Sequence, residues 1–453
     1  MFTSRDPSSG TIIQTFRNHS PVRIQRIVDR VSTAQVRWAA TAPAERSASL
    51  LRLADMLRSQ RQALAATITS EMGKRSAEAL SEVDKCAVVC DFYAVHAQAF
   101  LEPERLTTEA GESYVEYPPV GVVLAVMPWN FPLWQIVRCA VPALVAGNGV
   151  LVKPAPSTPA TALMFESLVG AAGLTPDIVR VILADEGRLE QVIAHPAVAV
   201  VSLTGSEQAG RAVAASAGRH LKRSVLELGG SDPLVVLADA DIEAAAQAAA
   251  SARFLNCGQS CIAPKRLIAV PQTAEAFVAS LTAAVAALRT GDPRAAETTL
   301  GPLASRIARK RLHAQVRASL AAGARLLLGG RPLPGPGAFY APTVLDHVAP
   351  GMPAFDDELF GPVACVVRAR DDAHALTLAA DSRFGLGASL WTADIERARR
   401  LARFMPVGMV AINATERSDP RLPFGGVKAS GYGRELSYHG LREFTSPRSI
   451  WVR

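Results

Sequence analysis

The sequence of 453 residues has few cysteines, few aromatic residues and no strong excess of one charge. Six cysteines, none in a C-x-x-C pair, are too few for a disulfide framework in a chain this long, and we expect no metal site. The net charge is +7, but the basic runs at 306–311 and 397–400 have no interleaved aromatic residues. We interpret these runs as solvated helix faces and expect no nucleic-acid partner.

No run reaches about 18 consecutive apolar residues, the length that a membrane-spanning helix requires. The most apolar segment, Cys139–Val152, is interrupted by Pro142, Gly147 and Asn148. The opening residues, MFTSRDPSSG, contain an early Asp and no apolar run, so we expect no signal peptide. A composition of 49% hydrophobic and 20% charged residues is typical of a globular protein. We expect a cytoplasmic location without membrane contact.

Short apolar runs alternate with helical segments from about residue 115 onward, after a mainly helical stretch at 20–100. The strand-like runs are 120–126, 149–152, 179–183, 198–203 and 225–228, then 234–237, 266–270, 325–328, 363–367, 388–391 and 409–412. Continuous apolar strands separated by helices indicate parallel sheets that are covered on both faces. The sequence therefore predicts an α/β fold of two doubly wound parallel-sheet domains, with a junction near Gly229-Gly230.

Two extended segments, Glu112–Tyr117 and Arg448–Arg453, fit neither of these sheets. Their alternating or β-branched character suggests that they pair as an additional small sheet. The edge of such a sheet would be exposed unless another chain covered it.

The segment Asn256-Cys-Gly-Gln-Ser-Cys261 contains the first candidate for chemistry. Gly258 and Ser260 allow a tight turn, which could present Cys261 at a domain interface as a thiolate nucleophile. A small buried residue is the alternative interpretation, because free cysteines are often buried. Cys257 is open to two interpretations as well, a redox partner of Cys261 or a packing residue.

Two polar residues stand at the ends of apolar runs. Glu227 precedes Gly229-Gly230 and is either paired structurally or held as a general base with a raised pKa. Asn130 lies between Pro128 and Pro132. A rigid amide donor there suits an oxyanion hole, and a simple turn asparagine is the alternative.

Two further segments are compatible with a bound dinucleotide. Lys153 stands at the carboxyl end of a predicted strand, and the stretch from Thr204 to Gly210 reads as a strand, a turn and the start of a helix. Backbone N–H groups at such a turn can bind phosphate. The stretch departs from G-x-G-x-x-G, so its spacing alone has little specificity.

Several motifs follow one another along the chain: PWNFP (128–132), LVKPA (151–155), TGS (204–206), LELGG (226–230), GQSC (258–261), DELFGPV (357–363) and PFGGVKASGYGRE (423–435). Together and in this order they resemble the motifs of the aldehyde dehydrogenase superfamily. Cys261 follows Glu227 by 34 residues, as in that family. The overall length and the segments MPWNFPLWQIVR and LELGGSDP are similar to those of the shorter bacterial succinate-semialdehyde dehydrogenases.

The resemblance implies a division of the chain into three parts. It implies a Rossmann-like cofactor-binding domain at 1–110 and 119–229, a catalytic domain at 230–435 and an oligomerisation arm at 111–118 and 436–453. The arm would pair across the subunits of a homodimer or homotetramer.

The resemblance also implies a reaction, the NAD(P)-dependent oxidation of an aldehyde to a carboxylic acid. Cys261 would attack the aldehyde carbon, and the amide of Asn130 with the backbone N–H of Cys261 would hold the oxyanion. Glu227 would activate the water that hydrolyses the thioester. The expected substrate is the small molecule succinate semialdehyde, and no metal is needed.

The implied cofactor is NAD or NADP. The positions matched to it are Met127, Trp129, Lys153, Pro156, Thr204, Gly205, Ser206, Leu228, Glu358 and Phe360. Glu358 and Phe360 match residues that hold the nicotinamide ribose, and Lys153 matches a contact to the adenosine ribose. NAD-specific relatives carry an acidic residue three positions after this lysine, where this chain has Pro156. We therefore expect NADP⁺ to be at least tolerated.

The positions that match the family's substrate tunnel are Trp134, Gln135, Arg138, Ser418 and Phe424. Arg138 matches an arginine that grips the distal carboxylate in succinate-semialdehyde dehydrogenases, and a helix–helix ion pair is the alternative for it. A second arginine of some relatives is replaced by Leu255, for which Arg421 could compensate.

Other functions stay open at this point. The substrate could be a medium-chain, aromatic or amino-aldehyde, or the enzyme could acylate coenzyme A, although Glu227 would then be superfluous. An inactive dehydrogenase fold with a binding or structural role is disfavoured by the joint presence of Cys261, Glu227 and Asn130. A cysteine hydrolase would require a histidine partner, for which the sequence has no local signature.

Overall fold

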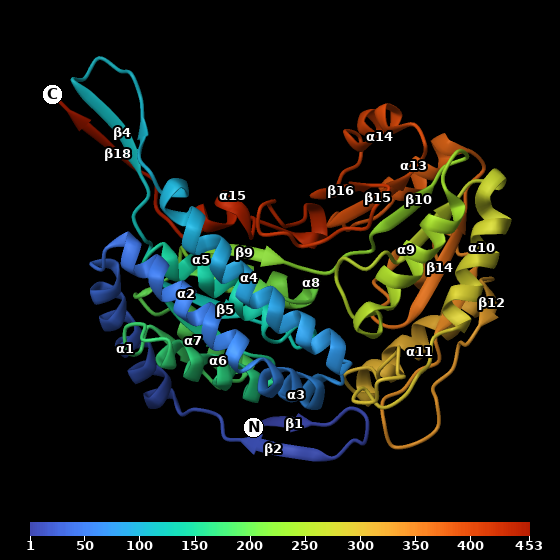
Figure 1. Ribbon diagram of the computed structural model, residues 1–453, viewed down its shortest axis with the longest axis horizontal. Coiled ribbons are helices and arrows are strands. Elements are labelled where there is room, and N and C mark those ends of the chain that lie inside the picture. Colours follow the sequence, from blue (N-terminus) through green and yellow to red (C-terminus); the bar gives the residue numbers. More distant parts are fainter.

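The computed structural model describes residues 1–453 and forms two α/β lobes, with a narrow arm projecting from one of them (Figure 1). The first lobe, at the left of Figure 1, contains a six-stranded sheet, and the second lobe contains a seven-stranded sheet. Both sheets are mostly parallel, which confirms the predicted pair of α/β domains.

The sheet of the first lobe has the strand order β17-β9-β8-β5-β6-β7. Its strands are β5 (Val122–Val126), β6 (Gly149–Lys153), β7 (Val179–Val181), β8 (Val198–Thr204), β9 (Arg223–Glu227) and β17 (Gly431–Tyr432). Only β17 runs antiparallel to its neighbour. Along β5, Val123 and Ala125 join one apolar core, while Val122 and Leu124 join another on the opposite face. Burial on both faces is the reason why these strands read as unbroken apolar runs.

Eight helices cover the first sheet. They are α1 (Pro21–Ala39), α2 (Pro43–Ser59), α3 (Arg61–Met72), α4 (Ser76–Phe100), α5 (Trp134–Val145), α6 (Pro159–Ala171), α7 (Glu186–Ile193) and α8 (Glu207–Arg219). Helices α2 to α6 build one core, and most of α1 packs with α7 and α8 in the other. The hydroxyl of Ser206 caps α8 by accepting a hydrogen bond from the backbone N–H of Ala209 at 3.2 Å.

The sheet of the second lobe has the order β12-β13-β14-β11-β10-β15-β16. Its strands are β10 (Pro233–Val236), β11 (Arg266–Ala269), β12 (Arg325–Leu328), β13 (Thr343–Asp346), β14 (Val363–Arg368), β15 (Gly387–Trp391) and β16 (Met409–Ile412). Only β12 is antiparallel to its neighbour. Strand β13 was not predicted, because only two of its four residues are apolar. The remaining helices up to residue 430 are α9 (Ile242–Phe254), α10 (Pro271–Ala286), α11 (Arg306–Ala321), α12 (Pro353–Asp356), α13 (Asp372–Ala380), α14 (Ile395–Ala402) and the 3₁₀ helices η1 (Leu255–Gly258) and η2 (Lys428–Ser430).

The arm is a small antiparallel sheet of β18 (Arg448–Val452), β4 (Glu112–Glu116) and β3 (Glu104–Arg105), in that order. Arg448 pairs with Glu116 and Val452 with Glu112, which confirms the predicted pairing of the two extended segments. A separate hairpin of β1 (Phe2–Arg5) and β2 (Ile12–Phe16) lies at the bottom of Figure 1.

The chain crosses between the lobes twice. It leaves the first lobe after β9, through Gly229-Gly230, and returns after β16. On the return, β17 joins the first sheet although it lies inside the predicted catalytic range 230–435. Helix α15 (Ser437–Arg442) lies inside the predicted arm range 436–453 but packs on the first lobe, where Tyr93 donates a hydrogen bond from its hydroxyl to the carbonyl of Ser437 at 3.0 Å.

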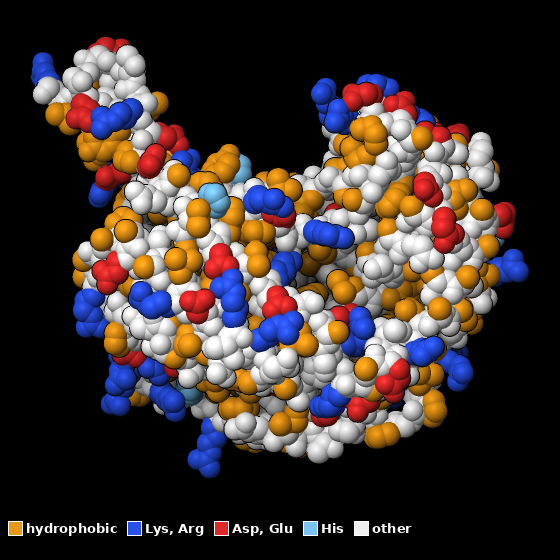
Figure 2. All heavy atoms as spheres, viewed as in Figure 1, with side chains coloured by type: hydrophobic (Ala, Val, Ile, Leu, Met, Phe, Trp, Pro, Cys, Tyr) orange, Lys and Arg blue, Asp and Glu red, His pale blue; other side chains and the backbone are white.

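Basic and acidic side chains are interspersed on the face shown in Figure 2, rather than gathered by sign. The protein has exposed ion pairs, such as that of Arg61 with Asp84 at 2.6 Å. None of the helices combines the length and the apolar character needed to cross a bilayer.

A buried ion pair fixes the start of α5. Glu82 accepts hydrogen bonds at one carboxylate oxygen from the backbone N–H groups of Leu133 at 3.0 Å and Trp134 at 2.9 Å, and its other oxygen binds Lys74. The Lys74 ammonium also lies 3.7 Å from the centre of the Phe131 ring. A carboxylate at a helix N-terminus is favourable because it satisfies otherwise free N–H groups. This contact holds the segment that precedes α5, which carries Asn130.

We predict that Lys74→Met lowers the free energy of unfolding by about 3–5 kcal/mol, because it leaves the buried Glu82 carboxylate without a counter-ion. Chemical denaturation, followed by fluorescence and circular dichroism, measures the change. Arg61→Met is the matched control, because it breaks an exposed ion pair and should leave stability nearly unchanged. Equal effects of the two substitutions would contradict the role given to the buried pair.

Candidate active site

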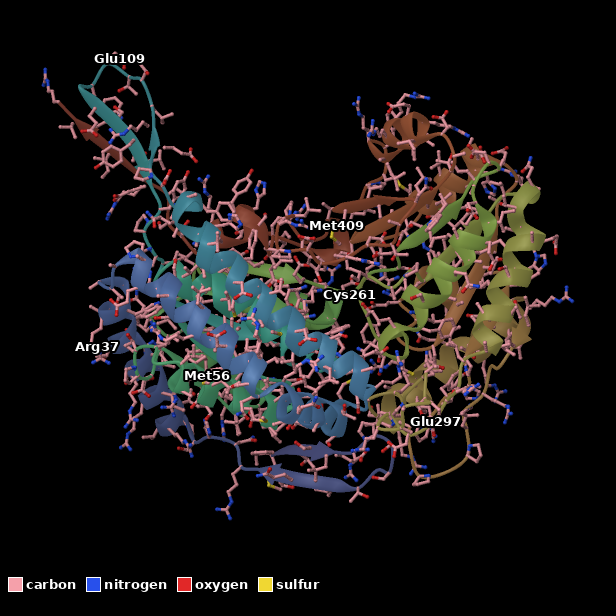
Figure 3. All side chains as sticks on the ribbon, viewed as in Figure 1. Arg37, Met56, Glu109, Cys261, Glu297 and Met409 are labelled. Carbon is pink, nitrogen blue, oxygen red and sulfur yellow. The ribbon has the colours of Figure 1, made fainter.

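A cavity of about 260 Å³ between the two lobes collects residues from distant parts of the chain. Nine of the predicted site residues line it: Trp129, Asn130, Thr204, Gly205, Ser206, Leu228, Cys261, Glu358 and Phe360. They come from the segment after β5, the turn between β8 and α8, the end of β9 and two loops of the second lobe. Figure 3 shows Cys261 at the junction of the lobes.

The loop that carries Cys261 is tightly constrained. Asn256 and Cys257 in η1 both have φ of 54°, in the left-handed region that non-glycine residues rarely adopt. Gly258 has φ of 70°, and a Cβ there would lie 2.2 Å from the carbonyl oxygen of Gly361. Only glycine fits this close approach. The loop buries Cys257 and leaves Cys261 partly exposed.

Two asparagines tie this loop to the first lobe. Asn130 Nδ2 donates a hydrogen bond to the carbonyl of Gln259 at 3.1 Å, and Asn256 Nδ2 donates one to the carbonyl of Asn130 at 2.8 Å. A side-chain amide has two N–H donors. Asn130 therefore keeps one donor for a ligand oxygen in the same cavity as the Cys261 thiol.

Burial and nearby charges shift the pKa of the Cys261 thiol in opposite directions. Burial raises the pKa of the Cys261 thiol to about 11, while the positive charges of Lys265 and Arg138 act in the opposite direction. Lys265 donates hydrogen bonds to the carbonyls of Ser260, at 2.8 Å, and Cys261, and its Nζ lies 3.3 Å from Glu358. The thiol is thus mainly protonated at neutral pH, and its proton must be removed before it acts as a nucleophile.

Glu227 ends β9 and is 2% exposed. Neither of its carboxylate oxygens has a hydrogen-bond partner. Burial and then the charge of Glu435 raise its pKa well above the usual range, against the influence of Arg138 and Arg434. A Cβ at Gly425 would lie 2.7 Å from Glu227 Oε1, so this glycine leaves room for the carboxylate. A buried, unpaired carboxyl with a raised pKa is suited to proton transfer.

Arg138 on α5 lies in an ion pair with Glu435, and both side chains are 1% exposed. Its Nη2 also donates a hydrogen bond to Thr204 Oγ1 at 3.3 Å, and its guanidinium lies 4.5 Å from the centre of the Phe424 ring. This is the ion-pair alternative raised for Arg138, although the partner lies between β17 and α15 and not on a helix. The charge that was predicted to face the substrate is already matched by Glu435.

Three predicted cofactor residues lie outside the wall of this cavity, at the carboxyl ends of the neighbouring strands β5 and β6. Lys153 is 7% exposed, and its Nζ lies 5.9 Å from the centre of the Phe2 ring. Met127 donates its backbone N–H to the carbonyl of Lys153 at 3.0 Å, and the carbonyl of Pro156 accepts a hydrogen bond from Thr3 at 3.0 Å. Burial lowers the pKa of Lys153. The charges of Glu186 and Asp185 act in the opposite direction, but neither carboxylate forms an ion pair with this lysine.

Helix α11 contributes residues to the cavity that were not predicted, among them Arg311, Leu312 and Gln315. The basic run at 306–311 was interpreted as a solvated helix face, and Arg311 is indeed exposed, but it also reaches the cavity. Helical spacing shows which residues share a face and not what that face lies against.

Two of the predicted substrate residues, Trp134 and Ser418, contact a second cation. Trp134, Gln135, Ser418 and Phe424 are all buried. Lys85 of α4 donates a hydrogen bond from its Nζ to Ser418, and the Nζ lies 4.2 Å from the centre of the Trp134 ring. Lys85 is the only lysine of a long helix, and no local motif marks it.

Comparisons with known proteins agree with one another. Residues 1–450 match the aldehyde dehydrogenase family. The chain is 47% identical over 414 residues to the succinate semialdehyde dehydrogenase [NAD(P)⁺] Sad of Escherichia coli (strain K12), covering 91% of this chain and 90% of that one. It is 44% identical over 449 residues to a succinate-semialdehyde dehydrogenase [NADP(⁺)] of Deinococcus radiodurans, covering 99% and 94%.

Solved structures show the same relationship. The succinic semialdehyde dehydrogenase of Streptococcus pyogenes, crystallised with NADP⁺ as the cofactor, superimposes with a TM-score of 0.97 at 36% identity and covers 100% of both chains. Both lobes and the arm therefore have their counterparts in an enzyme of known structure. With the full length matched in sequence and in structure, the chain belongs to the aldehyde dehydrogenase family.

Proposed function

We propose that this enzyme oxidises succinate semialdehyde to succinate, with NAD⁺ or NADP⁺ as the electron acceptor. The observation that carries the proposal is the cavity where the Cys261 thiol and a free N–H of Asn130 meet Glu358 and Phe360. The substrate is supported by relatives at 42–47% identity over nearly the full length, which carry that activity in their names.

The residues present fit a nicotinamide dinucleotide. The Trp129 and Phe360 rings meet edge to face in the cavity wall, with centroids 5.7 Å apart. A Cβ at Gly229 would lie 2.3 Å from Glu358 Oε2, so the glycine lets this carboxylate reach the cavity. Gly205 and Ser206 place the N-terminus of α8 where it can hold phosphate. When bound, the nicotinamide accepts a hydride from the aldehyde carbon.

The protein supplies the rest of the chemistry. The Cys261 thiolate forms a C–S bond to the aldehyde carbon, and the carbonyl electron pair moves to oxygen, where Asn130 Nδ2 and the Cys261 N–H stabilise the oxyanion. Loss of hydride leaves a thioester. Glu227 then takes a proton from water, the hydroxide adds to the thioester carbon, and the C–S bond breaks to release the carboxylate and regenerate the thiolate.

Choice of cofactor depends on the lysine at the end of β6. Lys153 is buried and forms no ion pair, and Pro156 occupies the position where an acidic residue would repel a 2′-phosphate. We therefore propose that both NAD⁺ and NADP⁺ bind.

The proposed function predicts a clear order of substrates. Initial rates of NAD(P)H formation at 340 nm should give a kcat/KM for succinate semialdehyde well above that for butyraldehyde or benzaldehyde, with turnover on both cofactors. Equal kcat/KM values for the three aldehydes would overturn the substrate, and strict dependence on NAD⁺ would overturn the proposed dual cofactor use.

Asn130→Ala should lower kcat by about 100- to 1000-fold, because one donor to the oxyanion is lost. Its effect on KM should be small, since the hydrogen bond strengthens in the transition state. Titration of the Cys261 thiol with iodoacetamide is the control that shows an intact loop. An unchanged kcat would remove Asn130 from the oxyanion hole, and Cys261→Ala should abolish turnover in the same assay.

We further propose that the arm assembles the enzyme into a homodimer or homotetramer. Strand β18 is an edge strand, Trp451 on it is 70% exposed, and β16 forms an open edge of the large sheet with Val410 36% exposed. Unpaired edges with apolar side chains favour association with another chain. Light scattering after gel filtration should show a dimer or larger species, and Trp451→Glu should shift it toward monomer. A monomeric wild-type protein would contradict this assembly.

A further inference from the structure

Lys85 is a cation held in a defined place without a carboxylate partner. Its side chain is partly buried, between Trp134 and Ser418. Of the three buried lysines, Lys74 and Lys265 each have a glutamate within ion-pair distance, whereas Lys153 and the partly buried Lys85 form no ion pair. Burying an ammonium without a counter-ion costs free energy, and buried charges are normally paired.

Its surroundings place Lys85 on the substrate side of the nucleophile. Trp134 belongs to the first lobe and Ser418 to the loop that follows β16 in the second, so the ammonium lies where the lobes meet. Burial, followed by the charge of Arg138, lowers the pKa of Lys85 to about 8, and the charge of Cys261 acts in the opposite direction. Cys261 packs against the same apolar core that contains Trp134, the residue on which the Lys85 ammonium lies.

The Lys85 ammonium has N–H donors that no protein group uses. A lysine has three N–H groups, of which Ser418 accepts one, while the Trp134 ring stabilises the charge through its face. At least one N–H is left for an oxygen of a ligand. An anionic oxygen would form a charge-assisted hydrogen bond there and supply the missing counter-ion.

Arg138, the cation that the family pattern assigns to the substrate, is less suited to this task. Its guanidinium is matched by Glu435, and both groups are almost fully buried. A substrate carboxylate that displaced Glu435 would leave a buried carboxylate unpaired, which is costly. No such loss occurs when the carboxylate binds Lys85.

We propose that Lys85, together with Ser418, binds the carboxylate of a short ω-carboxylated aldehyde and thereby determines substrate specificity. This inference rests on the proposed function, because it assumes a substrate with a carboxylate opposite the aldehyde. Binding by Lys85 would leave the uncharged end of the substrate for Cys261. Arg138 then serves as a structural partner of Glu435.

The test compares Lys85→Met with wild type on succinate semialdehyde and butyraldehyde, which have the same number of carbon atoms. Loss of a hydrogen-bonded charge should lower kcat/KM for succinate semialdehyde by about 10- to 100-fold. The change should be mainly in KM, and kcat/KM for butyraldehyde should stay within about threefold. Lys310→Met, at an exposed lysine of α11 away from Trp134 and Ser418, is the matched control and should change neither value.

The outcomes separate this inference from the proposed function. If wild type prefers succinate semialdehyde but Lys85→Met lowers both activities equally, Lys85 only supports the fold and the inference is wrong. If wild type shows no preference for the carboxylated aldehyde, the proposed substrate itself is wrong, and the inference falls with it.

The pH dependence of substrate preference provides a second test, in which Lys85→Arg is the conservative variant. The ratio of kcat/KM for the two aldehydes should fall in wild type as the pH rises through about 8, where Lys85 loses its charge. Lys85→Arg should abolish this fall, because arginine stays charged.

The other groups that face Lys85 are Arg138, Glu82, Cys86, Cys261 and Asp419. Burial keeps the pKa of Cys86 well above the usual range, and the Arg421 hydrogen bond lowers that of Asp419 to about 2, so neither titrates near pH 8. Cys261 attacks both aldehydes, and its titration cancels in the ratio. An alkaline fall that persists in Lys85→Arg would overturn the proposal.

Discussion

Hydrogen bonds among Asn130, Asn256 and the backbone of Gln259 hold the two lobes together at the nucleophile, and the active site depends on them. The loop before Cys261 contains two residues in the left-handed region, a conformation that costs about 1–3 kcal/mol for each non-glycine residue. Such a loop persists only where its surroundings determine it fully. The two asparagine side chains and the close contact of Gly258 with Gly361 hold this loop in its conformation.

The same loop therefore serves two purposes. It joins lobes whose sheets share no strand-to-strand hydrogen bonds, and it sets the Cys261 thiol in the same cavity as the Asn130 amide that we propose as the oxyanion donor. Precise placement of reacting groups contributes much of the rate enhancement of enzymes. A site assembled from two lobes gains this precision only when the contact between them is specific, and here that contact is made by the catalytic segments themselves.

Pairing of buried charges distinguishes structural from functional cations. Lys74 neutralises Glu82, which caps α5, and Arg138 neutralises Glu435 beside Glu227. Each of these two cations forms an ion pair with a buried carboxylate within the first lobe. Lys85 and Lys153 form no ion pair, although carboxylates lie near enough to affect the pKa of each, and each lies at a position where the proposed function requires an anion. The difference lies in their neighbours, because all four are positively charged side chains in buried or partly buried places.

Local sequence determined most of the strands and helices of both lobes, since unbroken apolar runs and helical periodicity depend on neighbouring residues alone, whereas β13 and β17 have no such run. The motifs around Asn130, Glu227 and Cys261 also indicated the chemistry. The tertiary structure decided what distant segments bring together. Strand β17 and helix α15 return to the first lobe, and this return delivers Glu435 to Arg138. That long-range contact gives Arg138 a carboxylate partner and leaves Lys85 without an ion pair, because the partner of a buried charge can come from any part of the chain.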